Sequence, residues 1–150
     1  MSRIKIDLPS RFQFSTELPV RISDVNYGGH LGNDAVLSIV HEARIRFLKE
    51  FGFSELDVAG SGIIMVDSAA MYRSEAFHGD MLVIDIVIQD MHAVGCDILY
   101  RITDKLSGRE VARVKTGIVF FDYAARKVVP VPERFRFWMM ETSSKGGVSP

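Results

Sequence analysis

One apolar stripe of helical spacing most constrains what this chain can fold into. Apolar residues recur every three or four positions between Val36 and Phe51, which predicts a single amphipathic helix of about 18 residues. Asn33 or Asp34 is a suitable N-cap, and Gly52 is a suitable stop. Because one such helix must bury its stripe against another apolar surface, the remaining segments have to supply a second layer.

Strand-like segments provide that layer. One precedes the helix and four follow it, at residues 12–22, 62–76, 81–91, 96–105 and 110–122. In the last segment Arg113 and Lys115 fall on one face and apolar residues on the other, which is typical of a half-buried antiparallel strand. Residues 54–60 suggest a short helical turn, and a second short helix is expected after Pro132. The predicted class is α+β, with an antiparallel sheet against one long helix.

Length and charge exclude several classes of protein. The 150 residues correspond to one domain, predicted at 1–141, with a polar tail at 142–150 that is expected to be disordered. Lys and Arg number 18 against 19 Asp and Glu, so the chain lacks the basic excess of a nucleic-acid binder. No apolar run reaches the roughly 18 residues of a membrane span, and no signal peptide is evident. We therefore expect a cytoplasmic protein with neither nucleic-acid nor membrane partners.

Cysteine and histidine usage argues against a metal or disulfide framework. Cys96 is the single cysteine, and we expect it to be buried in a strand. His41, His78 and His92 have no partners at metal-ligand spacing, so no metal is predicted. No cofactor is expected either.

A glycine-rich loop at residues 23–34 runs directly into the predicted helix. Backbone N–H groups at such a junction are free to stabilise negative charge that develops on a carbonyl oxygen. The candidate donors are Gly28, Gly29, His30 and Leu31, and Asn33 belongs to the same predicted oxyanion loop. A plain tight turn is the alternative interpretation of the glycines.

The loop carries the pattern Asp24, Gly29, His30 and Asn33, and the helix that follows carries Glu42 and Arg44. This segment resembles the opening of hotdog-fold acyl-CoA thioesterases of the 4-hydroxybenzoyl-CoA thioesterase type. Their pattern is roughly Asp-x-Asp-x-x-Gly-His-x-Asn-Asn-x-x-Tyr, followed by a helix with Glu-x-x-Arg. Glu42 and Arg44 fall near this last pair, with altered spacing. Further matches within the resemblance, which spans residues 12–137, are Gly79, Asp80, Arg126 and Pro132.

The resemblance implies a sheet of about five strands wrapped around one long central helix. It also implies a homodimer or homotetramer in which the site is shared between protomers. An independent argument for a dimer is that the strand at 81–91 is apolar on both faces apart from Asp85, so its second face needs cover.

The chain departs from the family pattern at the position that carries the family's usual catalytic residue. Asn26 stands where the family has its usual catalytic aspartate. Gly32, Val36 and Glu75 replace the family's asparagine, tyrosine and a frequent proline. The resemblance therefore supports fold and ligand class better than mechanism.

Four residues are the catalytic candidates. The Asn26 amide is able to hold a water or donate to a thioester oxygen, although it cannot act as a base. A base would then come from Asp24, His30 or Glu42, with bracing of the loop as the alternative role for His30. Asp34 is expected to act as a helix cap.

Substrate contacts are predicted on the second strand and among the basic residues. Asp67 and Arg73 face either a pocket or solvent. The basic residues suited to bind the phosphates of coenzyme A are Arg73, Arg101, Arg113, Lys115, Arg126 and Lys127.

We therefore expect hydrolysis of an acyl-CoA or acyl-carrier-protein thioester to a free acid and a thiol. The first alternative is a non-catalytic acyl- or CoA-binding hotdog protein, in which Asn26 marks the loss of chemistry. The second is a dehydratase that acts on a 3-hydroxyacyl thioester.

Overall fold

The computed structural model describes residues 2–144. Its elements, in chain order, are β1 (Phe14–Pro19), the 3-10 turn η1 (Ile22–Asp24), α1 (Asn33–Glu50), β2 (Gly62–Tyr72), β3 (Met81–Gln89), β4 (Gly95–Asp104), β5 (Glu110–Asp122), β6 (Lys127–Val128) and α2 (Glu133–Ser144).

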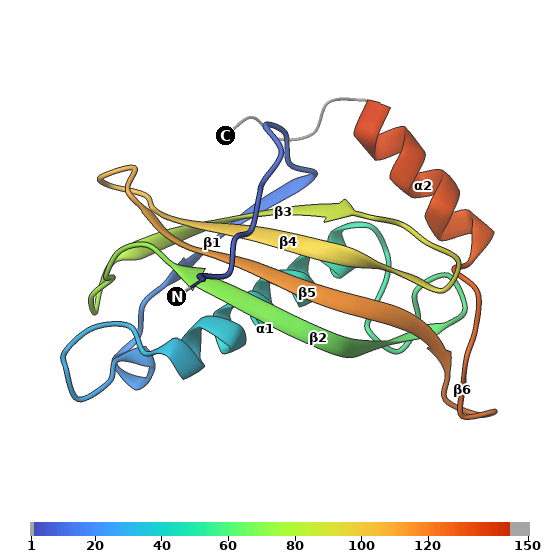
Figure 1. Cartoon of the computed structure of the whole chain (residues 1–150), viewed down its shortest axis with the longest axis horizontal. Helices are drawn as coiled ribbons and strands as arrows, with labels where there is room; N and C mark the ends of the chain where they lie inside the picture. Colours follow the sequence, from blue (N-terminus) through green and yellow to red (C-terminus); the bar gives the residue numbers. More distant parts are fainter. Residues whose placement is uncertain (1, 145–150) are drawn as a thin grey trace.

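One antiparallel sheet curves around α1, with α2 at one end (Figure 1). The strand order is β1-β3-β4-β5-β2, and the short β6 pairs with β5. This arrangement confirms the α+β class and the sheet wrapped around one long helix. β5 has the predicted bounds, whereas β2 ends at Tyr72, four positions before the expected residue 76.

The ends of α1 follow from glycine geometry. Gly32 is the N-cap, so the helix begins one residue earlier than a cap at Asn33, and two residues earlier than a cap at Asp34, would require. At the other end Gly52 adopts φ +81°, a left-handed conformation that glycine tolerates at little cost. The N–H groups of Gly52 and Phe53 donate to the carbonyls of Lys49 and Leu48 at 3.0 and 2.8 Å. The predicted stop is therefore confirmed.

Residues 54–60 form turns, not the predicted helical turn. The Ser54 hydroxyl accepts a hydrogen bond from the Asp57 N–H, and the Asp57 carboxylate accepts one from the Gly60 N–H. Such local side-chain bonds compete with the helical backbone pattern. Ala59 and Gly60 also have positive φ, which a right-handed helix excludes.

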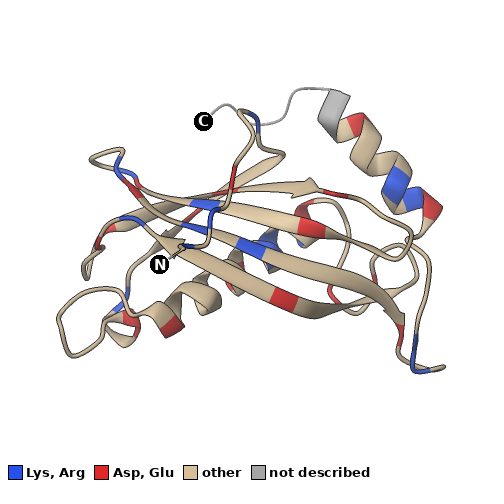
Figure 2. Cartoon of the chain, in the orientation of Figure 1, with Lys and Arg blue, Asp and Glu red and all other residues tan. Residues whose placement is uncertain are grey.

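The outer face of the sheet is covered by the N-terminal segment of the same chain. Ile6 and Phe12 are buried there against Val87 of β3 and Leu99 of β4. Basic and acidic positions lie close together on this face (Figure 2). The argument that a second protomer must cover β3 is therefore wrong, because non-adjacent residues of one chain provide the cover.

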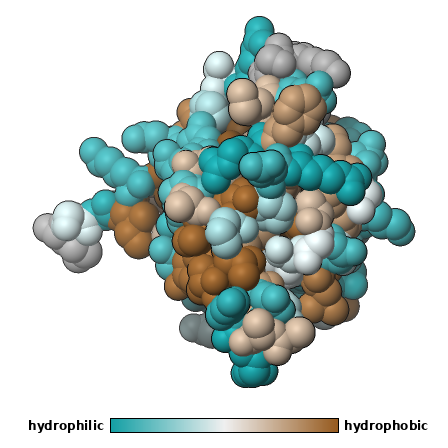
Figure 3. Space-filling model, turned by 90° about the vertical axis from the view of Figure 1, so that its right-hand side faces the viewer, coloured by the Kyte–Doolittle hydropathy of each residue, from teal (hydrophilic) through white to brown (hydrophobic). Residues whose placement is uncertain are grey.

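The C-terminal helix closes one end of the core. Trp138 of α2 packs edge-on against Phe51 and Phe53, with ring centroids 4.4 and 5.7 Å apart. Figure 3 shows this end of the molecule, where hydrophobic side chains gather in a patch bordered by hydrophilic residues. The helix continues to Ser144, past the boundary predicted at residue 141, and residues 145–150 of the predicted tail lie outside the described residues.

A polar network lies within the otherwise apolar contact between α1 and the sheet. The guanidinium of Arg44, on the buried face of α1, donates to the Tyr100 hydroxyl on β4 at 3.2 Å and to the Glu55 carboxylate at 2.8 Å. The Tyr100 hydroxyl also lies 2.9 Å from the Thr116 hydroxyl of β5. His41, one turn before Arg44, bonds the second oxygen of Glu55 at 2.9 Å. A buried charge needs hydrogen-bonding partners to be stable, and Tyr100 and Glu55 provide them for Arg44.

Glu55→Gln tests this network. Burial alone would raise the pKa of Glu55, but hydrogen bonds from Arg44 and His41 outweigh burial and lower that pKa. The folded state therefore gains stability from the ionised Glu55 above its unfolded pKa of about 4.3, and loses that gain as pH falls through the lower folded pKa. We expect the substitution to lower the free energy of unfolding by about 1–3 kcal/mol at neutral pH. The difference from wild type should shrink below about pH 4.

Urea unfolding across this pH range provides the measurement. The matched control is Glu17→Gln, which breaks an exposed ion pair with Lys105 and should change stability by no more than about 0.5 kcal/mol. A loss that is equal for both variants, or independent of pH, would contradict the role given to Glu55.

Candidate functional site

The loop before α1 is shaped by the side chain of Asn26. Its carboxamide oxygen accepts a hydrogen bond from the Gly28 N–H at 2.9 Å, while its backbone carbonyl accepts one from the Gly29 N–H at 3.0 Å. Gly29 has φ +84°, so the loop turns through a conformation that a residue with a side chain rarely adopts. The oxygen is engaged in the loop, whereas the amide nitrogen of Asn26 donates to no other group in residues 2–144 and is available to a ligand.

The loop is joined to the segment that follows β2. The Leu31 N–H donates to the Ala76 carbonyl at 2.8 Å, and the Gly32 N–H donates to the Asp24 carbonyl at 2.9 Å. These bonds bring residues distant in sequence to the two sides of one cavity of about 450 Å³. The cavity is lined on the loop side by Asn26, His30, Leu31, Asn33 and Val36, and on the other side by Tyr72, Arg73, Ser74, Glu75, Ala76 and Val111.

The hydrogen bonds of the loop restrict which predicted backbone donors are available. The N–H groups of Gly28, Gly29 and Leu31 already donate within the chain. Those of His30 and Asn33 donate to no other group in residues 2–144. The set of candidate donors at the cavity therefore narrows to His30 and Asn33.

Two of the predicted carboxylates lie at a different hollow. Asp24 is buried, its carboxylate accepts from the Arg21 N–H at 2.9 Å, and it lines a hollow of about 420 Å³ together with Glu42. Glu42 is exposed on α1 and bonds Arg46 at 3.1 Å. Neither side chain lines the cavity that contains Asn26, so the four predicted catalytic residues divide into two pairs.

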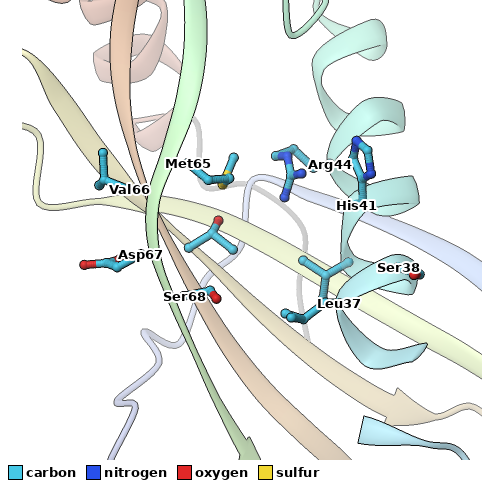
Figure 4. A pocket seen from close by; sticks show the side chains of 10 residues that line it. Leu37, Ser38, His41, Arg44, Met65, Val66, Asp67 and Ser68 are labelled. Carbon is cyan, nitrogen blue, oxygen red and sulfur yellow. The ribbon is translucent and has the colours of Figure 1, made fainter. Parts of the chain in front are cut away.

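A third hollow, of about 480 Å³, lies between α1 and β2 (Figure 4). Arg44 and Met65 point into the space between the two elements, whereas Val66 and Asp67 both point away from α1. Two consecutive residues share a side because β2 has a bulge between Met65 and Asp67. The Asp67 carboxylate is bonded to Lys115 at 2.7 Å and to the Gly117 N–H at 3.1 Å.

Sequence reasoning missed Glu75 as a site residue. It is the sole carboxylate among the side chains that line the Asn26 cavity, and it is exposed. Its replacement of the family's frequent proline was visible in the sequence. Its closeness to Asn26 was not, because it depends on the bond between Leu31 and Ala76.

Within residues 2–144, no group of three or more His, Cys, Asp or Glu side chains is arranged to bind a metal ion. No helix in the described part of the chain is long and apolar enough to cross a membrane.

A sequence profile of the Thioesterase-like superfamily matches residues 20–139. A 1,4-dihydroxy-2-naphthoyl-CoA hydrolase from Microcystis aeruginosa is 26% identical over 123 residues, which cover 80% of this chain and 88% of the hydrolase. A 1,4-dihydroxy-2-naphthoyl-CoA thioesterase from Synechocystis superposes with a TM-score of 0.77 at 23% identity, over 85% of this chain and 96% of the other. A Staphylococcus aureus protein determined in complex with CoA gives a TM-score of 0.79 at 16% identity, over 97% and 92% of the two chains.

Proposed function

Because the chain belongs to the Thioesterase-like superfamily, we propose that it hydrolyses an acyl-CoA thioester at the cavity between the Asn26 loop and the end of β2. The observation that carries the proposal is the convergence, in this one cavity, of an amide donor, free backbone N–H groups and a carboxylate. Acyl transfer to water needs these three things: a polarised carbonyl, a stabilised oxyanion and a base for the water proton.

Each of these residues has its own role in the proposed hydrolysis. The Asn26 amide and the N–H groups of His30 and Asn33 donate to the thioester oxygen. Glu75 takes a proton from water as the water oxygen adds to the carbonyl carbon. The C–S bond then breaks, the acid is released, and the proton on Glu75 passes to the thiolate. His30 is the alternative base in the same cavity, since an imidazole nitrogen is a common general base.

The hydrolase from Microcystis aeruginosa and the thioesterase from Synechocystis are named for a substrate with an aromatic acyl group, which is the first substrate to test. Both act on 1,4-dihydroxy-2-naphthoyl-CoA. The competing hypothesis is a non-catalytic acyl-CoA-binding protein. It is favoured by the replacement of the usual aspartate by Asn26, whose oxygen is used to shape the loop.

We also propose that two copies of the chain pair along β2. This strand is 11 residues long and forms one edge of the sheet, with Val66 57% and Tyr72 55% exposed. An unpaired edge of this length offers a row of backbone groups to another strand. The pairing would place a second protomer beside Tyr72 and Arg73, at the mouth of the candidate site.

The first prediction concerns turnover. Hydrolysis of a panel of acyl-CoA thioesters that includes the dihydroxynaphthoyl thioester should release free thiol. Asn26→Ala should lower kcat about tenfold to a hundredfold, and Glu75→Gln about a hundredfold or more. Glu50→Gln, at the far end of α1, is the matched control and should not change kcat. Absence of turnover across the panel would favour the binding-protein hypothesis, while a fully active Glu75→Gln would transfer the role of base to His30.

A second prediction concerns Gly29. Gly29→Val forces a β-branched residue into positive φ and should reduce kcat/KM strongly, because the turn that holds Asn26 and His30 would be displaced. Gly29→Asn tolerates positive φ and should keep most of the activity. Equal activity in the two variants would mean that the shape of this turn does not matter for turnover.

The last prediction of this group concerns assembly. Sedimentation at micromolar concentration should give the mass of a dimer or a larger assembly. A stable monomer would refute both pairing along β2 and a site shared between protomers.

A further inference from the structure

The outer face of the sheet carries basic residues of two kinds. Three are neutralised within the chain, because Arg101, Arg113 and Lys115 form ion pairs with Asp85, Glu110 and Asp67. These three had been candidate phosphate contacts from the sequence. Their pairing leaves them poorly suited to bind a further anion.

The second group of basic residues forms no ion pair in the described part of the chain. Arg3 and Lys5 of the N-terminal segment and Arg73 at the end of β2 form no ion pair within residues 2–144. All three line one hollow of about 830 Å³, between residues 2–5 on one side and residues 70–73 on the other. Figure 2 shows basic positions close to the N-terminus, where this segment lies near the end of β2.

The position of the N-terminal segment is fixed by its packing on the sheet. The Arg113 guanidinium donates to the Ile6 carbonyl at 3.0 Å, and the buried Ile6 side chain follows directly after Lys5. Phe12 is buried farther along, with the Arg101 guanidinium 4.5 Å from its ring centroid. The cations at positions 3 and 5 are therefore held next to β2 by the covered outer face.

This hollow adjoins the candidate active site. Tyr72 and Arg73 line both the 830 Å³ hollow and the 450 Å³ cavity that contains Asn26. A ligand with a reactive thioester in the cavity would thus extend past Tyr72 into a hollow lined by unpaired cations. Tyr72 is 55% exposed and presents an aromatic ring at the junction.

We infer that the cationic hollow binds the phosphorylated nucleotide end of coenzyme A, with Arg3, Lys5 and Arg73 contacting the phosphates. This inference rests on the proposed function, and it selects acyl-CoA over an acyl-carrier-protein thioester, which has no nucleotide. Guanidinium and ammonium groups are the usual phosphate ligands, and an exposed tyrosine ring offers a surface on which adenine stacks.

The first experiment measures the binding of adenosine 3′,5′-bisphosphate by titration calorimetry at low ionic strength. The double variant Arg3→Ala, Lys5→Ala should raise Kd about tenfold to a hundredfold, because charge-assisted contacts are lost. The matched control is Lys49→Ala, Arg134→Ala, which removes the same charge from the end of α1 and from α2, away from the hollow, and should leave Kd within about twofold. No binding to wild type, or an equal loss in both double variants, would overturn the inference.

The second measurement compares an acyl-CoA with the same acyl group on pantetheine, which lacks the nucleotide. The Arg3→Ala, Lys5→Ala variant should raise KM for the CoA thioester and leave kcat/KM for the pantetheine thioester unchanged. If wild type hydrolyses both thioesters equally well, the nucleotide site is refuted and the hydrolase stands. If neither is hydrolysed while the bisphosphate still binds selectively, the hydrolase is refuted and the nucleotide site stands.

Discussion

The buried guanidinium of Arg44 determines how the long helix sits on the sheet. A charge in this interior needs hydrogen-bonding partners, and it finds them in Tyr100 of β4 and Glu55 of the connection to β2. Displacing α1 by one turn would leave the charge unpaired, so the apolar stripe has one favoured position. Because the Asn26 loop leads directly into α1, the same contact also fixes the loop relative to Ala76.

The sequence predicted the features that depend on local patterns. Alternation defined β5 to the residue, helical spacing defined α1, and Gly52 marked its end. Features that depend on contacts between distant segments were missed. The cover that Phe12 gives to the outer face and the bulge beside Val66 arise only once the sheet has formed.

In the candidate site, too, the sequence predicted what depends on local pattern and missed what depends on contacts between distant segments. The chain pattern identified Asn26 and His30, and the turn that holds them follows from residues within four positions. It also grouped Asp24 and Glu42 with them, although their side chains open onto another hollow. Glu75 was noticed only as a departure from the family pattern, since nothing local to it indicates that it lines the same cavity as Asn26. The predicted roles of these residues remain predictions.

The single cysteine has a chemical consequence for a chain that we propose acts on thioesters. Cys96 is 1% exposed, and burial, with Asp97 beside it, raises the pKa of its thiol to about 12. A thiolate would exchange acyl groups with a thioester and form mixed disulfides with a released thiol. Holding this sulfur protonated inside β4 keeps the chain chemically inert toward both substrate and product. Any thiol detected during turnover would thus originate from the substrate alone.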